Sequence, residues 1–233
     1  MAESSRKVLV VEPDTGTRRE IKQACEQDGY QVVEADAGSE ALRQLESSHP
    51  SVVLLEVTLP DSVGFDVCRE LRKMDPAVPV IMMSSRSDEI DAVVALEIGA
   101  DDYVTKPLRL RELVARMAAH LRRARIENAE AMRSRLDFRD LTIDVNERRT
   151  YKNGKEIELT HTEFDLLTFL ASNAGKVLSR EKILNSIWGY EYPIETRVID
   201  VHIRNLRRKI EENPSRPTRL LTVYGVGYKL ADG

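Results

Sequence analysis

The chain has 233 residues, which is enough for two domains of roughly 100–150 residues each. Its 35 basic and 39 acidic residues give a net charge of −4, which by itself argues against nucleic-acid binding. The charge is unevenly divided, because residues 1–125 contain 17 basic and 22 acidic side chains whereas residues 126–233 contain 18 and 17. The overall charge therefore does not exclude a nucleic-acid partner for one half.

Several other classes of protein are excluded. Apolar runs such as Val52–Leu55 and Val80–Met83 are far shorter than the ~20 residues of a membrane-spanning helix. The first residues lack the apolar stretch of a signal peptide. Cys25 and Cys68 have no metal-ligand spacing, so we interpret them as core or helix thiols in a reducing compartment. We expect a cytoplasmic protein without a membrane partner.

Five short apolar runs alternate with five helical patterns in the first half of the chain. The predicted strands are 8–11, 32–33, 52–55, 79–83 and 103–105. The predicted helices are 17–27, 39–47, 65–74, 91–98 and 111–123. Continuous apolar strands are typical of a sheet buried on both faces, so we predict an α/β doubly wound, five-stranded parallel sheet. Ligands of such sheets bind beyond the carboxyl ends of the strands.

Polar side chains follow these predicted strands. They are Glu12 and Asp14 on either side of Pro13, then Glu56, Ser84 and Lys106. Three signatures lie in order at the strand ends: Leu55-Glu56-Val-Thr-Leu-Pro60, Met83-Ser84-Ser85-Arg86 and Gly99-Ala-Asp-Asp-Tyr-Val-Thr-Lys-Pro107. On these motifs, residues 6–124 resemble the receiver domain of response regulators, with the flavodoxin-like fold that this implies.

The resemblance implies a phosphorylation pocket. In receivers, a histidine kinase phosphorylates an aspartate after the third strand, and an acidic pair after the first strand holds Mg²⁺. Ser84 matches the hydroxyl that binds phosphoryl oxygens, and Lys106 matches the cationic clamp. Ser84 and Tyr103 match the residues of the conformational switch. A cation, a metal ion and a hydroxyl donor together neutralise a transferring phosphoryl group.

Two pocket positions depart from this pattern. Glu56 stands at the phosphoacceptor position, and Pro13 replaces one member of the acidic pair. Since Mg²⁺ requires near-ideal octahedral oxygen geometry, we expect weak or no metal binding by Glu12 and Asp14, and no other cofactor. We predict that this receiver does not depend on conventional aspartyl phosphorylation.

Several interpretations of the pocket stay open. Glu56 and Lys106 could form a buried ion pair that stabilises the fold, or Glu56 could imitate phosphoaspartate. An ordinary kinase-controlled regulator with residual phosphorylation, on Glu56 or on Asp61, is an alternative, although Asp61 is predicted to be a solvated loop residue. A receiver that acts as a protein- or ligand-interaction module is another. The segment Glu12-Pro-Asp14 superficially resembles a phosphohydrolase motif, but that chemistry requires aspartate at the first position, so we do not expect an enzyme.

A resemblance to the OmpR/PhoB family implies a homodimer through the fourth helix, fifth strand and fifth helix of the receiver. The matching positions are apolar Val93, Leu96 and Ala115 and the ion pair of Asp101 with Arg116. Two further family ion pairs are lost, because Ala92 and Ala118 replace basic residues. Exposed ion pairs contribute only about 0–1 kcal/mol each, so a dimer is still expected.

A linker at 125–136 separates the receiver, residues 1–124, from a second domain at 137–233. This linker is charged and continues the preceding helix. Strands are predicted at 136–138, 141–144 and 149–151, with a hairpin turn at Asn153-Gly154. Thr160-His-Thr-Glu163 is a predicted capping box that opens a helix. Further helices are predicted at 179–188 and 196–212, and two strands within 221–230.

The helix predicted at 196–212 is amphipathic and basic. Its apolar stripe consists of Ile199, Ile203, Leu206 and Ile210. Residues 196–210 contain five basic side chains and one acidic side chain. Four motifs, Thr160-xx-Glu-Phe-xx-Leu167, Val177-Leu-Ser-Arg180, Val201-His-Ile-Arg-xx-Leu-Arg207 and Gly225-xx-Tyr228, resemble the α+β winged helix-turn-helix domain of OmpR/PhoB regulators.

This resemblance implies a transcription regulator that binds double-stranded DNA, with the basic helix in the major groove and the final hairpin near the minor groove. Residue chemistry then predicts the contacts. The predicted DNA-binding residues are Arg197, Val201, His202, Arg204, Asn205, Arg207, Arg208, Thr222 and Tyr224. Family members often have arginine at the positions of Asn205 and Tyr224, so base preference is expected to differ. The 188–193 loop matches a segment that contacts RNA polymerase in the family, although Trp188 can also be a core residue.

Overall fold

The computed structural model describes residues 6–85, 89–126, 135–189 and 197–231. The chain divides into two compact units, residues 1–121 and 122–233. Within the described residues, no helix is both long and apolar enough to cross a membrane.

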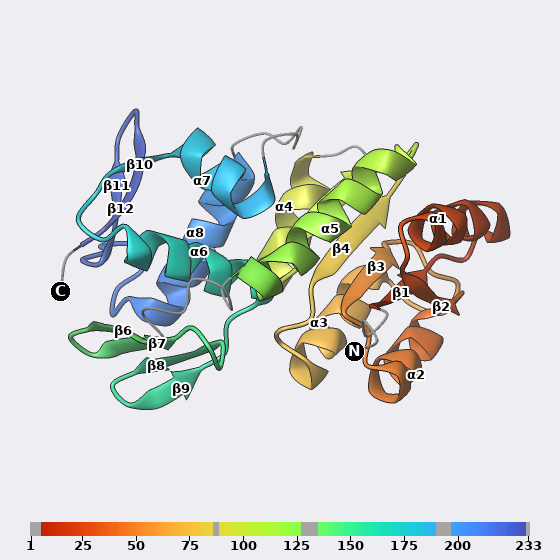
Figure 1. Ribbon diagram of the computed structural model, residues 1–233, viewed down its shortest axis with the longest axis horizontal. Coiled ribbons are helices and arrows are strands. Elements are labelled where there is room, and N and C mark those ends of the chain that lie inside the picture. The colour runs from red at the N-terminus through yellow and green to blue at the C-terminus, as the bar shows by residue number, and fades with distance from the viewer. Residues whose placement is uncertain (1–5, 86–88, 127–134, 190–196, 232–233) are drawn as a thin grey trace. The chain divides into compact units, whose positions relative to one another are not determined.

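The N-terminal unit is built on one parallel sheet with the strand order β2-β1-β3-β4-β5 (Figure 1). The strands are β1 (Lys7–Val11), β2 (Gln31–Ala35), β3 (Val52–Glu56), β4 (Val80–Ser84) and β5 (Asp102–Thr105). The helices between and after them are α1 (Thr15–Gln27), α2 (Gly38–Ser48), α3 (Gly64–Met74), α4 (Glu89–Ile98) and α5 (Leu110–Ile126). The predicted doubly wound five-stranded sheet is therefore confirmed, with α5 extending beyond the predicted receiver boundary at residue 124.

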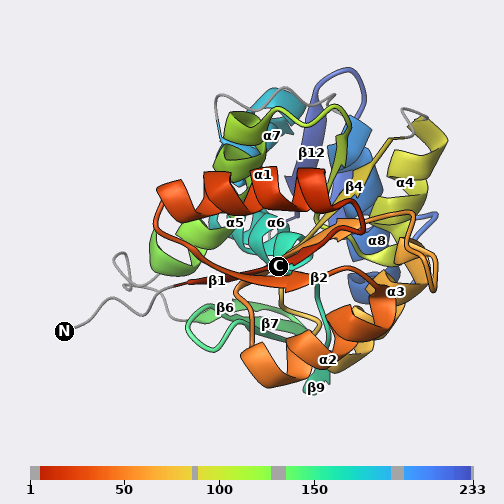
Figure 2. The ribbon, with the colours of Figure 1, turned by 90° about the vertical axis from the view of Figure 1, so that its right-hand side faces the viewer.

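Both faces of this sheet are covered, which explains why its strands are apolar throughout. Leu9 and Leu55 pack with α2, α3 and α4 on one face, whereas Val8 and Leu54 pack with α1 and α5 on the other. Figure 2 shows α1 and α2 on opposite sides of the sheet. Successive side chains of a strand point to opposite faces, so each strand must be apolar at every position.

The C-terminal unit begins with an antiparallel sheet and ends with a smaller one. The first sheet contains β6 (Arg135–Phe138), β7 (Leu141–Asp144), β8 (Arg149–Lys152) and β9 (Lys155–Ile157). The second has the order β10-β12-β11, with β10 (Leu178–Ser179), β11 (Leu220–Val223) and β12 (Gly227–Leu230). Asn153 and Gly154 have φ of 52° and 73°, as the predicted hairpin turn requires. The short strand β10 was not predicted.

Three helices, α6 (His161–Ser172), α7 (Arg180–Trp188) and α8 (Arg197–Ile210), form the centre of this unit. The capping box of α6 is confirmed, because Thr160 and Glu163 exchange side-chain and backbone hydrogen bonds. Ser179 caps α7 by accepting a hydrogen bond from the Lys182 backbone. The predicted apolar stripe of α8 is buried in the core of the unit.

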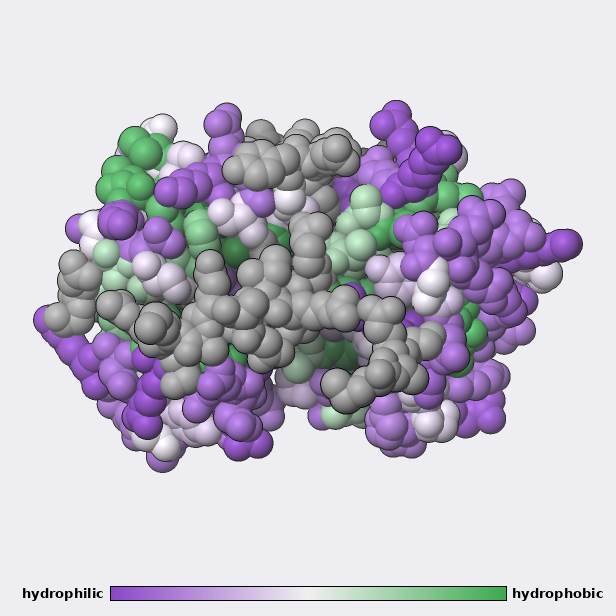
Figure 3. Space-filling model, viewed as in Figure 1, coloured by the Kyte–Doolittle hydropathy of each residue, from purple (hydrophilic) through white to green (hydrophobic). Residues whose placement is uncertain are grey.

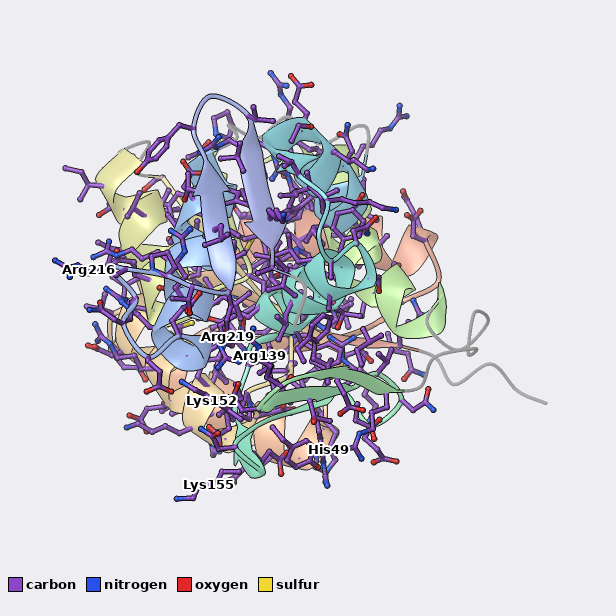
Figure 4. The ribbon with its side chains drawn as sticks, turned by 90° about the vertical axis from the view of Figure 1, so that its left-hand side faces the viewer. His49, Arg139, Lys152, Lys155, Arg216 and Arg219 are labelled. Carbon is purple, nitrogen blue, oxygen red and sulfur yellow. The ribbon has the colours of Figure 1, made fainter. Side chains whose placement is uncertain are left out.

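The segment after α8 is anchored to the rest of the C-terminal unit. The buried Glu211 carboxylate accepts hydrogen bonds from the backbone N–H groups of residues 218, 219 and 220, at 2.8–3.0 Å. Lys152 Nζ donates to the Glu211 carbonyl at 3.1 Å, and Arg219 forms an ion pair with Asp140 (Figure 4). These contacts fix where β11 begins relative to the end of α8.

Candidate functional site

The pocket at the carboxyl ends of the receiver strands contains two buried glutamates that share one lysine. Glu12 and Glu56 are only 1% and 3% exposed. Lys106 Nζ lies 2.7 Å from Glu12 Oε2 and 2.6 Å from Glu56 Oε2. The other carboxylate oxygens accept backbone hydrogen bonds, Glu12 Oε1 from Asp14 and Glu56 Oε1 from Thr58. Each carboxylate therefore has both an ionic partner and a backbone partner.

Strand topology brings these three side chains together. Glu12 follows β1, Glu56 is the last residue of β3, and Lys106 follows β5. The Lys106 N–H donates to the Ser84 carbonyl at 2.7 Å, which fixes the backbone of the lysine at the end of β4. Burial lowers the pKa of Lys106, but hydrogen bonds and charge from Glu56 and Glu12 outweigh it, so this pKa lies above its ordinary value. Lys106 is therefore cationic at neutral pH.

Asp14 and Pro13 lie beside the pocket with different roles. The Asp14 carboxylate accepts a hydrogen bond from the Thr17 N–H at 2.7 Å and caps α1. This backbone hydrogen bond lowers the pKa of Asp14. Pro13 has no side-chain oxygen at all. Over the residues that the structure describes, no group of three or more His, Cys, Asp or Glu side chains has a metal-binding arrangement.

The two predicted switch residues lie on neighbouring strands. Ser84 is the last residue of β4 and its side chain is fully buried. Tyr103, in β5, is half-buried and packs at the edge of the core between the sheet and α2, α3 and α4. The structure thus places Ser84 at the end of the strand next to that of Glu56.

Asp61, predicted to be a solvated loop residue, has a structural role. Its two carboxylate oxygens accept hydrogen bonds from the N–H groups of Gly38 at 2.8 Å and Ser39 at 3.0 Å. These hydrogen bonds hold the pKa of Asp61 far below its usual range. Asp61 lies in an exposed loop, as predicted, and it supplies the acceptor that Ala37, the N-cap residue of α2, lacks.

The predicted dimer positions are in part buried. Val93 is half-buried and Ala115 is exposed, whereas Leu96 is 2% exposed. Asp101, predicted to pair with Arg116 in the dimer, is buried within the chain, where its carboxylate lies 2.6 Å from Arg72 Nη2 and accepts the Val80 N–H. The reason is that Arg72 reaches Asp101 from α3.

Arg116 has other acidic partners than the predicted one. Its guanidinium is nearly buried and forms ion pairs with Asp102, at 3.3 Å, and with Glu112 on the same helix. The sequence motif Asp101-Asp102 offers two adjacent carboxylates, and the strand alternation directs only the second one toward α5.

In the C-terminal unit, α8 presents two exposed arginines, Arg204 and Arg208, with Val201 half-buried beside them. Arg197 is the first residue of α8, but its side chain lies outside the described residues. Asn205 is predicted to contact DNA, yet its side chain is buried. Its Oδ1 accepts a 3.4 Å hydrogen bond from Arg208 Nη1 one turn further along, which draws the amide against the helix.

His202 is also corrected from a surface residue to a buried one. Its ring lies next to that of Trp188, with the ring centroids 5.6 Å apart, and both side chains are almost completely buried. Position 202 flanks the apolar stripe of α8, so it turns toward the core rather than toward solvent. Trp188 is therefore a core residue, as one of the two interpretations proposed. Residues 190–193 of the predicted RNA polymerase loop lie outside the described residues.

Arg207 is bound to the hairpin of β11 and β12, which we call the wing. Arg207 Nε and Nη2 donate to the Leu220 carbonyl at 2.9 and 2.7 Å, and Nη2 donates to Thr222 Oγ1 at 2.8 Å. Arg207 also lies over the ring of Tyr228. The predicted DNA contacts Arg207 and Thr222 thus bind each other.

A second contact joins the wing to α7 and α8. The Tyr228 hydroxyl donates to Asp200 Oδ1 at 2.6 Å, and Arg180 Nε lies 2.9 Å from the same oxygen. Burial, together with the hydrogen bond to Asp200, raises the pKa of Tyr228 to about 12. This contact is not predicted from the sequence, although Arg180 and Tyr228 both occur in motifs of the winged-helix domain.

The tip of the wing is apolar and exposed. Tyr224 is 92% exposed and Val226 is 49% exposed, and Figure 3 shows hydrophobic surface over this hairpin at the upper left of the view. Gly225 between them has φ of 74°, and Gly227 packs so closely on β10 that a Cβ would lie 2.0 Å from the Leu178 carbonyl. These glycines allow a tight hairpin that projects Tyr224 outward.

Comparisons with known proteins agree with this architecture. Residues 8–118 match the family model described as the response regulator receiver domain, and residues 154–230 match the model of the C-terminal part of transcriptional regulatory proteins. The DNA-binding response regulator MtrA of Mycobacterium tuberculosis H37Rv is 41% identical over 224 residues, covering 96% of each chain.

Solved structures also cover almost the whole length of the chain. A mutant of RitR aligns with a TM-score of 0.82 and 29% identity, over 98% of this chain and 100% of that one. DrrB of Thermotoga maritima, described as an OmpR/PhoB homologue, has a TM-score of 0.53 and 36% identity, over 97% and 99%. The chain therefore belongs to the OmpR/PhoB family of response regulators, with a receiver domain followed by a winged-helix DNA-binding domain.

Proposed function

We propose that this protein is a sequence-specific DNA-binding regulator whose receiver operates without conventional aspartyl phosphorylation. The observation that supports this most directly is the ion-paired arrangement of Glu56, Lys106 and Glu12. The cation expected to bind a phosphoryl group is already shared by two buried carboxylates. A third anion at this ammonium would have to displace one of them into a buried site without a counter-charge.

We also infer that Mg²⁺ binds weakly or not at all. Glu12 is engaged by Lys106, Asp14 caps α1, and Pro13 has no ligand atom. A magnesium ion would therefore have to compete with Lys106 for the carboxylate of Glu12 and with the N-terminus of α1 for the carboxylate of Asp14. Phosphoryl transfer in a receiver requires Mg²⁺ to neutralise charge on the phosphoryl group. Weak Mg²⁺ binding therefore disfavours residual phosphorylation of Glu56.

Asp61 is a poor alternative phosphoacceptor. Both of its oxygens already accept backbone hydrogen bonds from the start of α2. Phosphorylation of either oxygen would break one of these hydrogen bonds and would add charge without a described lysine or arginine at hydrogen-bonding distance. The 2.6 Å contact of Glu56 with Lys106 supports both imitation of phosphoaspartate and a buried ion pair that stabilises the fold.

The test of this proposal is phosphoryl transfer to the whole chain. We expect no labelled protein after incubation with labelled acetyl phosphate and Mg²⁺, under conditions that label a conventional receiver. The double variant Pro13→Asp/Glu56→Asp is expected to bind Mg²⁺ and to become labelled. Stable labelling of the parent chain, abolished by Glu56→Gln or Asp61→Asn, would refute the proposal in favour of residual phosphorylation.

DNA binding is proposed to involve α8 and the wing together. Arg204 and Arg208 are exposed on one side of α8, and the wing presents Tyr224. Duplexes selected by the chain from a random-sequence pool should show a shared motif, and affinity should fall steeply with log salt concentration. Binding without sequence selection, or without salt dependence, would contradict this part of the proposal.

A homodimer is proposed through α4 and the neighbouring receiver surface. Ile90 is 68% exposed and Val93, one turn further along α4, is half-buried, which gives this helix an apolar surface. Val93→Arg is a better probe than a change at buried Leu96. Sedimentation should show a dimer of the parent and a monomer of the variant, and an unchanged dimer would exclude this surface.

A further inference from the structure

One basic side chain of α8 differs from its neighbours in what it binds. Arg207 uses its Nε–Nη2 edge to hold the Leu220 carbonyl, and Nη2 also donates to Thr222 Oγ1. By contrast, Arg204 and Arg208 are exposed on the same helix. All three arginines carry the same charge, so their roles can differ only through the groups that they contact.

The contacts of Arg207 leave little capacity for a phosphate. An arginine grips a phosphate or carboxylate best when two parallel N–H groups along one edge of the guanidinium donate together. In Arg207 the Nε–Nη2 edge faces the Leu220 carbonyl, and the remaining N–H of Nη2 serves Thr222. Neither edge of the guanidinium is left with both of its N–H groups available.

The same contacts connect the two elements that are proposed to reach DNA. Arg207 belongs to α8, whereas Leu220 and Thr222 belong to β11, the strand that leads directly to Tyr224 at the tip of the wing. Tyr228 on β12 holds the start of α8 through Asp200. Arg207 therefore adds contacts at Leu220 and Thr222 to the hydrogen bonds that Glu211 makes with the start of β11 and to the pairing of β12 with β10.

We propose that Arg207 is a positioning residue that sets the wing relative to α8, rather than a phosphate contact. This inference rests on the proposed DNA binding by α8 and the wing. Without Arg207, Thr222 near the end of β11 loses its contact with α8, so the tip of the wing is held less firmly although Glu211 and Tyr228 still anchor its base. The contact of Tyr224 with DNA then becomes less favourable although no charge at the DNA surface has been removed.

The first test compares Arg207→Lys with Arg207→Gln on a duplex selected by the parent chain, over a range of salt concentrations. Lysine retains the charge but cannot form the bidentate contact with Leu220. We expect both variants to lose affinity by about tenfold, with an unchanged slope of log affinity against log salt. Arg208→Gln, at an exposed position of α8, should instead reduce that slope by about one. Arg216→Gln, in the exposed loop after α8, is the matched control and should behave like the parent.

Rescue of affinity by Arg207→Lys, or a slope reduced by about one in Arg207→Gln, would overturn the proposal in favour of a phosphate contact. A parent chain that selects no DNA sequence would instead refute the proposed function itself. The two failures are distinguishable because the parent is measured first.

A double-mutant cycle with Tyr224→Ala provides a second readout. Arg207 contacts β11 at Leu220 and Thr222, whereas Tyr224 follows the end of that strand, so a coupling between Arg207 and Tyr224 is expected only if Arg207 acts through the position of the wing. In the Tyr224→Ala background, Arg207→Lys should cost less than about half of the affinity loss that it causes alone. Additive losses would contradict the proposal. The folding of Arg207→Lys is checked by its urea transition, followed by Trp188 fluorescence. If this variant does not fold, Thr222→Val is the milder variant, because it removes only the hydroxyl acceptor. Thr222→Val should show the same coupling with Tyr224→Ala.

Discussion

Replacement of Lys106 by methionine tests the receiver pocket most severely. Methionine has a similar length but no charge, so the change leaves Glu12 and Glu56 facing each other in a site where they are 1% and 3% exposed. Removal of one partner from a buried ion pair typically destabilises a protein by about 3–5 kcal/mol. Because the Lys106 side chain is 22% exposed, water can reach part of the site, and we take the lower end, about 3 kcal/mol.

This free energy corresponds to a large change in melting temperature. At about 2.1 cal/mol/K per residue, unfolding of the unit of residues 1–121 has an entropy of about 0.25 kcal/mol/K, so Tm should fall by about 12 °C. By contrast, Glu56→Gln leaves the Lys106–Glu12 pair in place and should change the stability by no more than about 1 kcal/mol. The raised pKa of Lys106 means that these effects persist at neutral pH, and that the contribution of the pair is lost only as the pH rises above 10.5.

The assay uses the full chain and three signals. Calorimetry and far-ultraviolet circular dichroism follow both units, whereas the single tryptophan, Trp188, reports only on the C-terminal unit. We expect Lys106→Met to lower the receiver transition without moving the fluorescence transition. Equal stability of Lys106→Met and the parent, or equal destabilisation by Glu56→Gln and Lys106→Met, would refute the assignment of Lys106 as the cation shared by both glutamates.

Three further predictions concern other parts of the chain. Thr160→Ala removes the N-cap side chain of α6 and should destabilise the C-terminal unit by about 1 kcal/mol, measured by urea titration followed by fluorescence. An unchanged transition would show that the capping box is dispensable. Because the pKa of Tyr228 is raised to about 12 from 10.0, its contribution to stability should be complete below pH 10 and lost as the pH rises toward 12. Tyr228→Phe should abolish this alkaline loss, and a loss of the same size in the variant would exclude Tyr228 as its origin. Burial raises the pKa of Cys25 to about 12 and that of Cys68 to about 11. Neither thiol should therefore react with iodoacetamide at pH 8 in the folded chain, as measured by mass spectrometry. Rapid alkylation would contradict the burial of these thiols.

Much of the fold could be predicted from the sequence because the relevant signals are local. The five apolar runs predict buried parallel strands, and the 3.6-residue spacing of Ile199, Ile203, Leu206 and Ile210 predicts the buried side of α8. Thr160 and Glu163 indicate the start of α6 within four residues of chain. Even the gathering of Glu12, Glu56 and Lys106 could be foreseen, because the carboxyl ends of parallel strands meet at one edge of a sheet.

The pairing of polar side chains could not be predicted in this way. Lys106 and Glu12 are 94 residues apart, Asp101 and Arg72 are 29 apart, and Asp61 and Gly38 are 23 apart. No periodicity relates such positions, and each carboxylate or guanidinium could in principle bind any of several partners. Asp101 was assigned to a surface for this reason, because the sequence contains no sign that Arg72 reaches it from α3.

The opposite charges in the receiver and the basic helix in the second domain follow from composition and spacing alone. The sequence alone indicates that α8 is basic on one side and that the receiver lacks one carboxylate at Pro13. The folded chain is needed to show that Arg207 binds the wing while Arg208 is exposed, and that Lys106 is shared by two glutamates. The physical reason is that a charge is a property of the residue, whereas its partner depends on which segments the fold brings within hydrogen-bonding distance.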